Sequence, residues 1–357
     1  MSTRKARSVR RSEQRRRIMP PLRDGINASP MRLPEDAAGE HLTVGDWLTA
    51  RFGAEAAHGL LERGDVLAGQ GVVVTADWPY LAGERLWLFR PVLDEPAEPI
   101  VLDVVAENER YLVIHKPHGI STAPKGSHVA GSALVAARRQ FGNDLLVPAH
   151  RLDLETAGLL LLVKEPQWRG AYQKLFERRR IRKSYRAVAP LIAGAVPARE
   201  GQSWHSELML YKKDGELIVR VIDSTCENGG EPVAPEFPAV AGAGSEAAPS
   251  YYGEHRRRRE RTATAVTDIT LERELGRGLG YYALYPHTGF THQLRVAMNE
   301  LGAPICGDPL YPRVLLLEES AERPYPLQLL AASLDFEDPV TGESVHLESS
   351  QQLQLAH

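Results

Sequence analysis

"VPAHRLDLETAGLLLLVKEP", residues 147–166, sets a polar island beside an apolar run. The island is His-Arg-Leu-Asp at residues 150–153, and the apolar run covers residues 159–163. A short run of this kind predicts a strand that enters the core. A buried carboxylate is costly unless it is paired. Asp153, at the edge of this strand, is therefore either a satisfied structural group or a group that does chemistry.

Cationic side chains are available to pair with Asp153. Arg151 is two residues earlier, and on a strand both side chains would face the same side. Arg295 lies far downstream in HTGFTHQLR, at the expected start of a helix. In RKSYRA, strand alternation places Lys183 and Tyr185 on one face. From the residues alone, Asp153 with Arg151 or Arg295 is either an ion pair that joins strands or part of a site.

The composition is that of an ordinary globular protein. The chain has 357 residues, 43% hydrophobic and 25% charged, enough for one large domain or two to three smaller units. No window approaches the roughly 18 apolar residues of a membrane span. The two cysteines, Cys226 and Cys306, suggest no disulfide framework. We therefore expect a protein of the reducing cytoplasm that contacts no membrane.

The net charge of -3 hides a strong asymmetry. Residues 1–18 contain eight Lys/Arg and one Glu, a charge of +7 that leaves -10 for the rest of the chain. An arginine-rich start without an apolar core segment is not a secretory signal. It is typical of an organellar transit peptide, of a disordered arm that contacts RNA, or of a solvated tail.

The N-terminal quarter predicts a basic arm and a small α/β module. Residues 1–40 lack apolar periodicity, and we expect them to be disordered or loosely draped over the surface. Residues 41–95 predict two short helices, the first with Thr43 as N-cap, followed by strands such as GERLWLFRP. This order resembles the RNA-binding module named after a small-subunit ribosomal protein. Arg51 and Arg63 are few cations for such a module, so it is either an RNA-binding unit or a structural cap.

Residues 98–345 predict one larger α+β domain. Turn signals separate two strands within 98–118, and further strands are expected at 183–189, 204–211, 217–223, 264–273 and 279–286. Helices are expected in GSALVAARRQFG, from about 167 to 180, and in THQLRVAMNELG, which Gly302 would end. Many strands with few helices indicate a mixed, largely antiparallel sheet with flanking helices.

Residues 224–262 interrupt this domain. The segment is rich in Gly, Pro, Ala, Ser and Glu, and it ends in the basic run 256–259. Such a composition cannot bury enough apolar surface to fold. We expect a disordered insertion in an otherwise continuous domain.

Several familiar site patterns do not occur in the sequence. GRGLG lies between two expected strands and no Gly-Lys-Ser/Thr follows it, which argues against a phosphate loop. There is no CxxC or HExxH motif, and His287 and His292 are too far apart for one helical face to present both to a metal. No G-x-S-x-G nucleophile elbow occurs.

Five motifs occur together and in a fixed order. They are VIHKPHGISTAP, HRLDLETAGLLLL, RKSYRAVAP, HTGFTHQLRVAMNELGAPICGDPLYP and LQLLAASLDFEDP. The second resembles the signature of the pseudouridine synthases that modify large-subunit ribosomal RNA and transfer RNA, which reads His-Arg-Leu-Asp, two free positions, Thr-Ser-Gly-Leu-Leu. The others resemble that family's Lys-Pro-x-Gly strand, its Lys-x-Tyr strand, its Gly-x-Thr-His-Gln-Leu-Arg helix with a following Gly-Asp, and its closing strand. The resemblance covers residues 107–339 without the insertion.

Two positions depart from the family pattern. Ala157 stands where the family usually has Ser, a small-for-small change that we expect to be tolerated. Phe290 stands where Arg is common before Thr-His-Gln. The missing cation leaves the choice of RNA open.

The resemblance implies an RNA pseudouridine synthase that isomerises specific uridines in ribosomal or transfer RNA, with the family's α+β fold. Asp153 would be the essential carboxylate, acting as a nucleophile toward the sugar or as a base that removes a sugar proton. Arg295 would pair with Asp153 and keep it ionised and aimed. Tyr185 would stack on the flipped uracil.

The same resemblance implies residues that bind the substrate. Arg151 would occupy the space vacated by the base or hold a phosphate. Leu294 would pack against the uracil, and His292 would line the substrate site and orient its loop. His150 would either touch RNA or be a satisfied structural histidine.

Basic residues around the predicted helix-to-strand turn would contact RNA phosphates despite the acidic total. They are Lys174, Arg178, Arg179, Arg180, Arg182 and Lys183. For the first three, a solvated helix end favoured by the macrodipole is the alternative. Because the net reaction is an isomerisation, we expect no metal or organic cofactor. We also expect a monomer whose partner is RNA.

Two other classes of protein remain open. One is a non-catalytic RNA-binding or ribosome-assembly protein on the same scaffold, against which Asp153, Tyr185 and Arg295 argue. The other is a carboxylate-dependent nucleosidase or glycosidase that uses a pair of acids. Glu155 is the only near partner acid for that chemistry.

Overall fold

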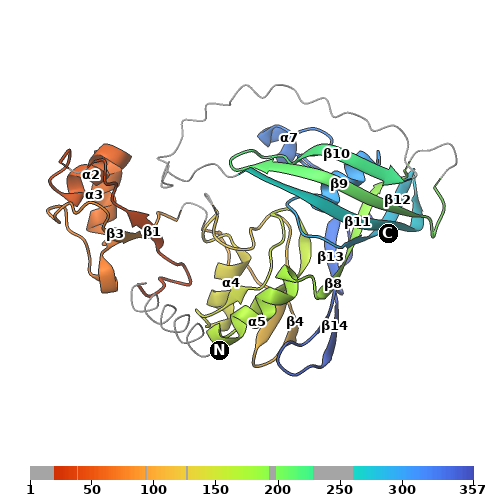
Figure 1. The fold of residues 1–357 in the computed structure, drawn as a ribbon, viewed down its shortest axis with the longest axis horizontal. Helices are drawn as coiled ribbons and strands as arrows, with labels where there is room; N and C mark the ends of the chain where they lie inside the picture. Colours follow the sequence, from red (N-terminus) through yellow and green to blue (C-terminus); the bar gives the residue numbers. More distant parts are fainter. Residues whose placement is uncertain (1–19, 38, 93–94, 126–127, 193–197, 228–259) are drawn as a thin grey trace. The chain divides into compact units, whose positions relative to one another are not determined.

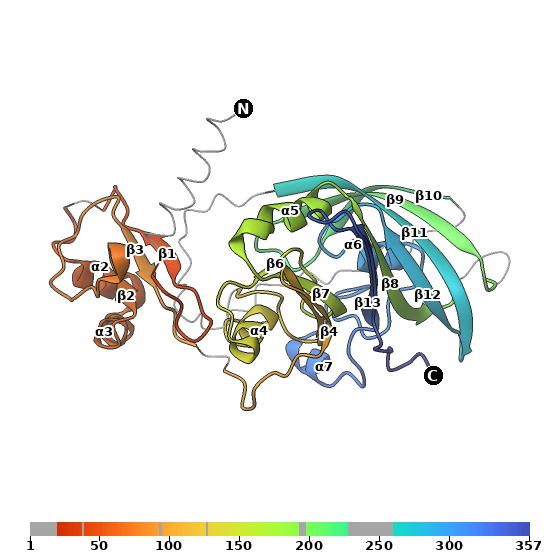
Figure 2. The same cartoon turned by 90° about the horizontal axis from the view of Figure 1, so that it is seen from below.

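The described residues form two compact units, one before Pro96 and one from Pro96 onward (Figures 1 and 2). The computed structural model describes residues 20–37, 39–92, 95–125, 128–192, 198–227 and 260–357. The predicted basic arm of residues 1–18 and most of the predicted insertion lie outside the described residues.

The N-terminal unit packs two helices against a three-stranded antiparallel sheet of order β1-β3-β2. Its elements are β1 (Ser29–Arg32), α2 (Val44–Phe52), α3 (Ala54–Glu62), β2 (Val66–Leu67), the short 3-10 helix η1 (Gly69–Gly71) and β3 (Arg85–Leu88). The predicted N-cap is confirmed. The Thr43 hydroxyl accepts the Asp46 N–H at 3.1 Å, and the Asp46 carboxylate accepts the Thr43 N–H at 3.1 Å.

The prediction that residues 1–40 are disordered or loosely draped is wrong for the part that the structure describes. Strand β1 pairs with β3 from Ser29 opposite Leu88 to Arg32 opposite Arg85, and Leu33 is fully buried behind it. Four residues are too few to show a clear alternation, and the partner strand lies far along the chain. The pairing, and not the local pattern, orders this segment.

The C-terminal unit is a large sheet with helices packed on it, which confirms the α+β prediction. Its elements are β4 (Val104–Glu107), β5 (Tyr111–Lys116), α4 (Ala133–Phe141), β6 (Val147–Pro148), β7 (Ala157–Val163), α5 (Pro166–Glu177), β8 (Ile181–Pro190), β9 (Ser203–Lys213), β10 (Arg220–Glu227), β11 (Glu260–Gly276), β12 (Leu279–Pro286), α6 (Gln293–Glu300), α7 (Leu317–Ala321), β13 (Leu329–Glu337) and β14 (Ser344–Glu348). Gly302, with a φ of 73°, follows α6 as predicted.

The sheet is almost entirely antiparallel. Its order is β10-β9-β11-β12-β8-β13-β7-β5-β4, with β14 on β13 and β6 on β7. Among the described pairs, only β13 with β7 runs parallel. Strand β13 lies between β8 and β7 and joins the two halves of the sheet. In Figure 1 the half with β9 to β12 lies in the upper part of the picture, and the half with β4 lies in the lower part.

The apolar run of β7 is buried on both faces. Leu159, Leu161 and Val163 pack in a cluster with α5, while Leu160 and Leu162 pack in a cluster with α4. A strand covered on both sides reads as a continuous apolar run, which explains the sequence pattern. The strand therefore anchors the polar loop that precedes it.

Gly158, one residue into β7, is required by close packing. Its φ is 111°, and a Cβ there would lie 2.3 Å from the Ala331 carbonyl oxygen on β13. Any larger residue would push apart the single parallel pairing that joins the two halves.

The predicted domain limits need two corrections. Strands β10 and β11 extend into the predicted insertion, so residues 224–227 and 260–262 are strand. The domain also continues past residue 345, because Leu353 and Ala356 are buried against Leu330. These residues follow the end of β14 and form no strand, so no alternating pattern in the sequence predicts their burial. None of the described helices is long and apolar enough to cross a membrane.

Candidate active site

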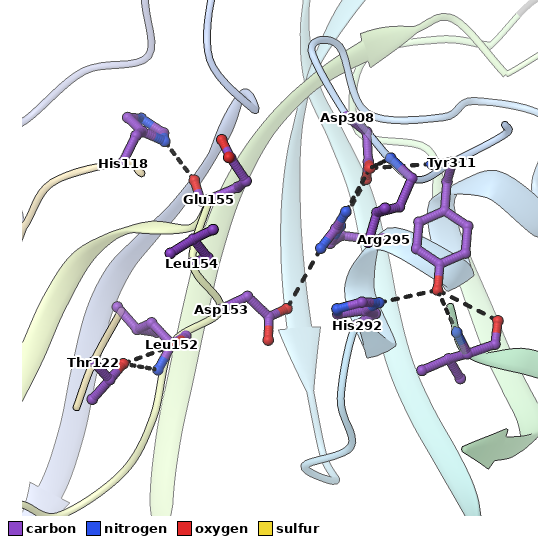
Figure 3. Close-up of polar contacts among 12 residues, drawn as sticks. His118, Thr122, Leu152, Asp153, Leu154, Glu155, His292, Arg295, Asp308 and Tyr311 are labelled. Atoms are coloured by element: carbon purple, nitrogen blue, oxygen red, sulfur yellow. Dashed lines mark hydrogen bonds and ion pairs between the residues drawn. The ribbon is translucent and has the colours of Figure 1, made fainter. Parts of the chain in front are cut away.

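Asp153 lies in the loop of residues 149–156, between β6 and β7 (Figure 3). The loop is not strand, so the prediction that Arg151 and Asp153 share a strand face is wrong. The Ala149 N–H still bonds to the Leu161 carbonyl of β7. Around Asp153, however, the loop backbone bonds to side chains of neighbouring segments, which removes the alternation of a ladder. Arg151 is exposed, and the Asp153 side chain is 32% exposed.

Two side chains pin the backbone on either side of Asp153. The Thr122 hydroxyl donates to the Leu152 carbonyl at 2.8 Å and accepts the Leu152 N–H at 3.0 Å (Figure 3). The Lys116 ammonium donates to the Leu154 carbonyl at 3.1 Å. Both neighbours of Asp153 are therefore held, and the direction of its side chain is set by the fold.

Lys116 ends β5 and is completely buried. Its ammonium donates to three carbonyls, two in the turn after β5 and one at Leu154. Burial lowers the pKa of Lys116 to about 7, and the charges of Asp153 and Glu155 act in the opposite direction. A buried lysine thus ties the Lys-Pro-x-Gly turn to the loop that carries Asp153.

The depressed pKa of Lys116 predicts a pH dependence of stability. The folded group titrates near pH 7 and an unfolded lysine near 10.5. Between these values the unfolded chain holds a proton that the folded chain lacks. Lys116 therefore makes the free energy of unfolding rise with pH in this window, by at most about 1.4 kcal/mol per pH unit.

Lys116→Met should remove this contribution. Urea unfolding of both proteins at pH 7, 8 and 9 measures it. The difference in free energy of unfolding, wild type minus variant, should increase with pH. Parallel curves would show that Lys116 keeps an ordinary pKa.

Arg295 approaches Asp153 from the first turn of α6. Its Nη1 lies 4.0 Å from Asp153 Oδ2, within ion-pair range but too far for a hydrogen bond. Its nearer partner is Asp308, whose two carboxylate oxygens accept from Nε at 2.7 Å and from Nη2 at 2.6 Å. The structure brings the predicted pair together and adds a closer carboxylate that sequence reasoning missed.

The guanidinium of Arg295 is 2% exposed and charged. Burial opposes its charge, but the hydrogen bonds and charge of Asp308, with a smaller effect of Asp153, raise the pKa of Arg295 above its ordinary value. One cation therefore faces two carboxylates. Asp308 accepts the hydrogen bonds of the guanidinium, and among the described residues none donates a hydrogen bond to the Asp153 carboxylate.

Tyr185 lies close to Asp153 on the central strand β8. Lys183 is two residues earlier on the same strand, so both side chains share one face. Burial, and then the charge of Asp153, raise the pKa of Tyr185 above its ordinary range. The phenol is protonated beside the carboxylate.

His292 precedes α6 with a left-handed backbone, at a φ of 56°. Its Nδ1 lies 3.1 Å from the Tyr311 hydroxyl, which also accepts the Val219 N–H at 2.8 Å. Burial, with the charge of Arg295, lowers the pKa of His292 to about 3, so the ring is neutral. Leu294, in the first turn of α6, is buried in the core.

His150 has a structural environment. Its Nε2 accepts the Leu161 N–H at 3.1 Å, and its ring stacks on Phe176 of α5 with centroids 4.3 Å apart. Burial lowers the pKa of His150 to about 3. A neutral histidine thus ties the Asp153 loop to β7 and α5.

Glu155 is engaged outside the Asp153 site. Its carboxylate pairs with Arg323 at 3.4 Å, and its carbonyl oxygen lies 2.6 Å from His118 Nδ1. Figure 3 shows the Glu155 and Asp153 side chains pointing in different directions. This arrangement gives no support to a paired-acid nucleosidase or glycosidase.

The two departures from the family pattern are accommodated by packing. Ala157 is buried in a cluster with Val188 and Leu330. Phe290 packs against the core cluster beneath α6, and its N–H donates to the Gln293 side chain at 3.1 Å. Neither position introduces a buried charge.

The predicted basic cluster lies at the end of α5 and the start of β8. Its four arginines are Arg178, Arg179, Arg180 and Arg182. All four are exposed, and none makes an ion pair within the described part of the chain. Lys183 is more buried, and burial lowers its pKa. Four cations of this kind on one short segment form a positively charged surface.

Three residues that shape the site were missed by sequence reasoning, namely Thr122, Lys116 and Asp308. Each lay in a motif that the resemblance had singled out, in STAP, Lys-Pro and Gly-Asp. Their partners could not be read from those motifs. Among the described residues, no three His, Cys, Asp or Glu side chains gather as metal ligands.

Comparisons with known proteins show which proteins the chain resembles. A family model described as RNA pseudouridylate synthase matches residues 110–300. The ribosomal large subunit pseudouridine synthase D of Neisseria meningitidis is 27% identical over 304 residues, covering 78% of this chain and 69% of that protein. The dual-specificity RNA pseudouridine synthase RluA of Vibrio parahaemolyticus is 27% identical over 248 residues, covering 68% and 80%. The solved human RNA pseudouridylate synthase domain containing 1 is 20% identical with a TM-score of 0.49, covering 72% and 86%.

Proposed function

The chain belongs to the RNA pseudouridylate synthase family and isomerises uridine in RNA to pseudouridine, and we propose that Asp153 is its catalytic carboxylate and ribosomal RNA of the large subunit its substrate. Relatives carrying the large-subunit name support the choice of RNA. The observation that supports Asp153 most is its setting. It is a partly exposed carboxylate on a pinned loop, 4.0 Å from a buried guanidinium.

The reaction defines what the site must do. The bond between the base nitrogen and the ribose breaks, the base rotates, and a new bond forms through the ring carbon that loses its proton. Asp153 attacks the sugar or removes a sugar proton, and both roles need an ionised carboxylate with free lone pairs. Arg295 keeps a positive charge next to that carboxylate without donating a hydrogen bond to it.

The target uridine must leave its stack before it reaches Asp153, at a cost of a few kcal/mol. Tyr185 would receive the flipped uracil by stacking, with Leu294 behind the base. His292, neutral and held by Tyr311, would line the same site. Arg151, exposed on the loop, is free to enter the space that the base vacates or to hold a phosphate.

The basic cluster at the end of α5 would hold the RNA backbone. Neutralising Arg178, Arg179, Arg180 and Arg182 to Gln should weaken binding and reduce the slope of log affinity against log salt by about 3, at 0.7–0.9 for each RNA phosphate that an arginine no longer neutralises. Filter binding at several salt concentrations measures this slope.

A matched control tests whether position or total charge matters. Lys213, Arg220 and Arg313 are cations with carboxylate partners elsewhere in the unit. Their triple change to Gln lowers the net charge almost as much and should leave the slope unchanged. Equal slopes in the two variants would show that the basic cluster is not a contact surface.

The N-terminal unit would add to RNA binding only modestly through the two predicted cations. The Arg51 guanidinium lies over the rings of Trp47 and Phe52, and Arg63 pairs with Asp65 at 2.7 Å. Both therefore already have partners inside the unit. The basic arm of residues 1–18, with its charge of +7, is the stronger candidate for phosphate contacts.

Tritium release identifies the substrate. Large-subunit ribosomal RNA fragments and transfer RNAs are transcribed with uridine tritiated at the ring carbon that becomes glycosidic, then incubated with the full chain. Release to water from a ribosomal fragment is expected. Release from transfer RNA alone would replace the proposed substrate. Release from neither, with binding intact, would favour a non-catalytic RNA-binding role and contradict the proposal.

A further inference from the structure

Asp308 is a buried carboxylate in the turn after α6. Its side chain is completely inaccessible, and it accepts two hydrogen bonds from Arg295. Its Oδ1 also accepts the N–H groups of Leu310 at 2.8 Å and Tyr311 at 3.2 Å. Four donors therefore saturate this carboxylate, so its position is determined by the fold.

The two-point hydrogen-bonded contact, or fork, between Asp308 and Arg295 fixes the direction of the guanidinium. The group is planar, and Asp308 occupies the edge formed by Nε and Nη2. The remaining nitrogen, Nη1, is the atom that faces Asp153 at 4.0 Å (Figure 3). A guanidinium without this constraint would be free to offer Asp153 a closer, two-point contact.

Asp308 also positions Tyr311, which contacts His292. By accepting the Tyr311 N–H it fixes the turn that carries the Tyr311 ring. The hydroxyl of that ring lies 3.1 Å from His292 Nδ1, and the Arg295 guanidinium lies 5.4 Å from the ring centroid. One carboxylate therefore sets both the cation that faces Asp153 and the phenol that holds His292.

We propose that Asp308 is a positioning residue for the isomerisation, holding Arg295 so that the Asp153 carboxylate stays directed and free of hydrogen bonds from the guanidinium. The proposal rests on the proposed role of Asp153. Without Asp308, Arg295 is a buried cation with Asp153 as its remaining carboxylate partner among the described residues. It would move to Asp153 and occupy the lone pairs that react with the sugar.

Asp308→Asn tests this role. The variant keeps the size of the side chain, removes the charge and leaves one acceptor oxygen. We expect the single-turnover rate of tritium release to fall about 100-fold, the loss that a displacement near 1 Å produces. RNA affinity should stay within twofold, because the basic cluster is not involved. A loss of affinity without a loss of rate would contradict a positioning role.

Asp338 provides a matched control. Like Asp308, it is a buried carboxylate that accepts from an arginine, Arg110 at 3.2 Å, and from two backbone N–H groups of a turn. It lies outside the Asp153 site. Asp338→Asn should lower the unfolding temperature as Asp308→Asn does and leave the rate per folded molecule near that of wild type. Equal rate losses in both variants would reduce Asp308 to a structural role.

A double variant tests whether Asp308 acts through Arg295. If it does, Arg295→Met with Asp308→Asn should be no slower than Arg295→Met alone, within about threefold. A further 100-fold loss would show that the two residues act independently and would overturn the proposal.

Two outcomes separate this proposal from the proposed function. Turnover by Asp153→Asn would remove the assigned role of Asp153 whatever Asp308 does. An inactive Asp153→Asn together with a fully active Asp308→Asn would remove only the role of Asp308. If Asp308→Asn does not fold, Asp308→Glu keeps the charge but displaces it by one methylene. A rate at least tenfold lower with unchanged affinity supports positioning, and a wild-type rate refutes it.

Discussion

Asp153→Asn should abolish isomerisation while leaving the fold and RNA binding intact. We expect the single-turnover rate of tritium release to fall by roughly 10⁴-fold or more, the loss that follows when an essential reactive group is removed. The amide can neither attack the sugar nor take up its proton.

The fold should tolerate Asp153→Asn because the carboxylate makes no hydrogen bond with a side chain in the described part of the chain. Its ion pair with Arg295 spans 4.0 Å, and the side chain is 32% exposed. The free energy of unfolding should therefore change by about 1 kcal/mol or less. Circular dichroism, urea unfolding and filter binding check these points beside the rate.

Glu155→Gln is the matched control for Asp153→Asn. It neutralises a carboxylate two residues away whose partner is Arg323. This variant should keep at least a tenth of the wild-type rate. If Glu155→Gln is inactive and Asp153→Asn is active, the roles of the two acids must be exchanged, and a paired-acid mechanism would return.

Arg295→Ala should produce the second largest loss. Removing a buried charge that faces the reacting group costs about 100- to 1000-fold in rate. It should also lower the free energy of unfolding by about 3–5 kcal/mol, because Asp308 is left buried without its partner. Rates must therefore be compared per folded molecule, with the folded fraction taken from thermal unfolding.

Arg295→Lys separates charge from geometry. An ammonium keeps the positive charge but cannot form the two-point fork with Asp308 and face Asp153 at once. We expect a rate between those of Arg295→Ala and the wild type, with much of the stability retained. A rate for Arg295→Ala equal to that of the wild type would show that Asp153 depends on another cation.

Local sequence signals located most of the elements but not all of them. The helix at Thr43, the stop at Gly302 and the strand at residues 159–163 each follow from patterns within a few residues. Strand β1 does not, since four residues carry too little pattern and its order comes from β3. Arg151 and Asp153 were expected on a strand and lie in a loop for a related reason. Around Asp153 the backbone bonds to side chains from other segments.

The sequence by itself determined the reaction class and the residue that we place at its centre. Five motifs in a fixed order carry this information, and the apolar run behind Asp153 shows that a polar island borders the core. Periodicity and apolar runs are local properties of a chain, so the order of the residues alone reveals them.

Only the tertiary structure decided how Asp153 is held. Three residues hold it through contacts that their motifs do not reveal. The Lys116 ammonium and the Thr122 hydroxyl bond to the loop backbone, and Asp308 accepts hydrogen bonds from Arg295. These segments come together only when strand β13, from the C-terminal part of the sequence, pairs between β8 and β7 and joins the two halves of the sheet. Hydrogen bonds are directional and need a donor and an acceptor within a few ångströms, so their partners are set by how the whole chain folds and not by neighbouring residues.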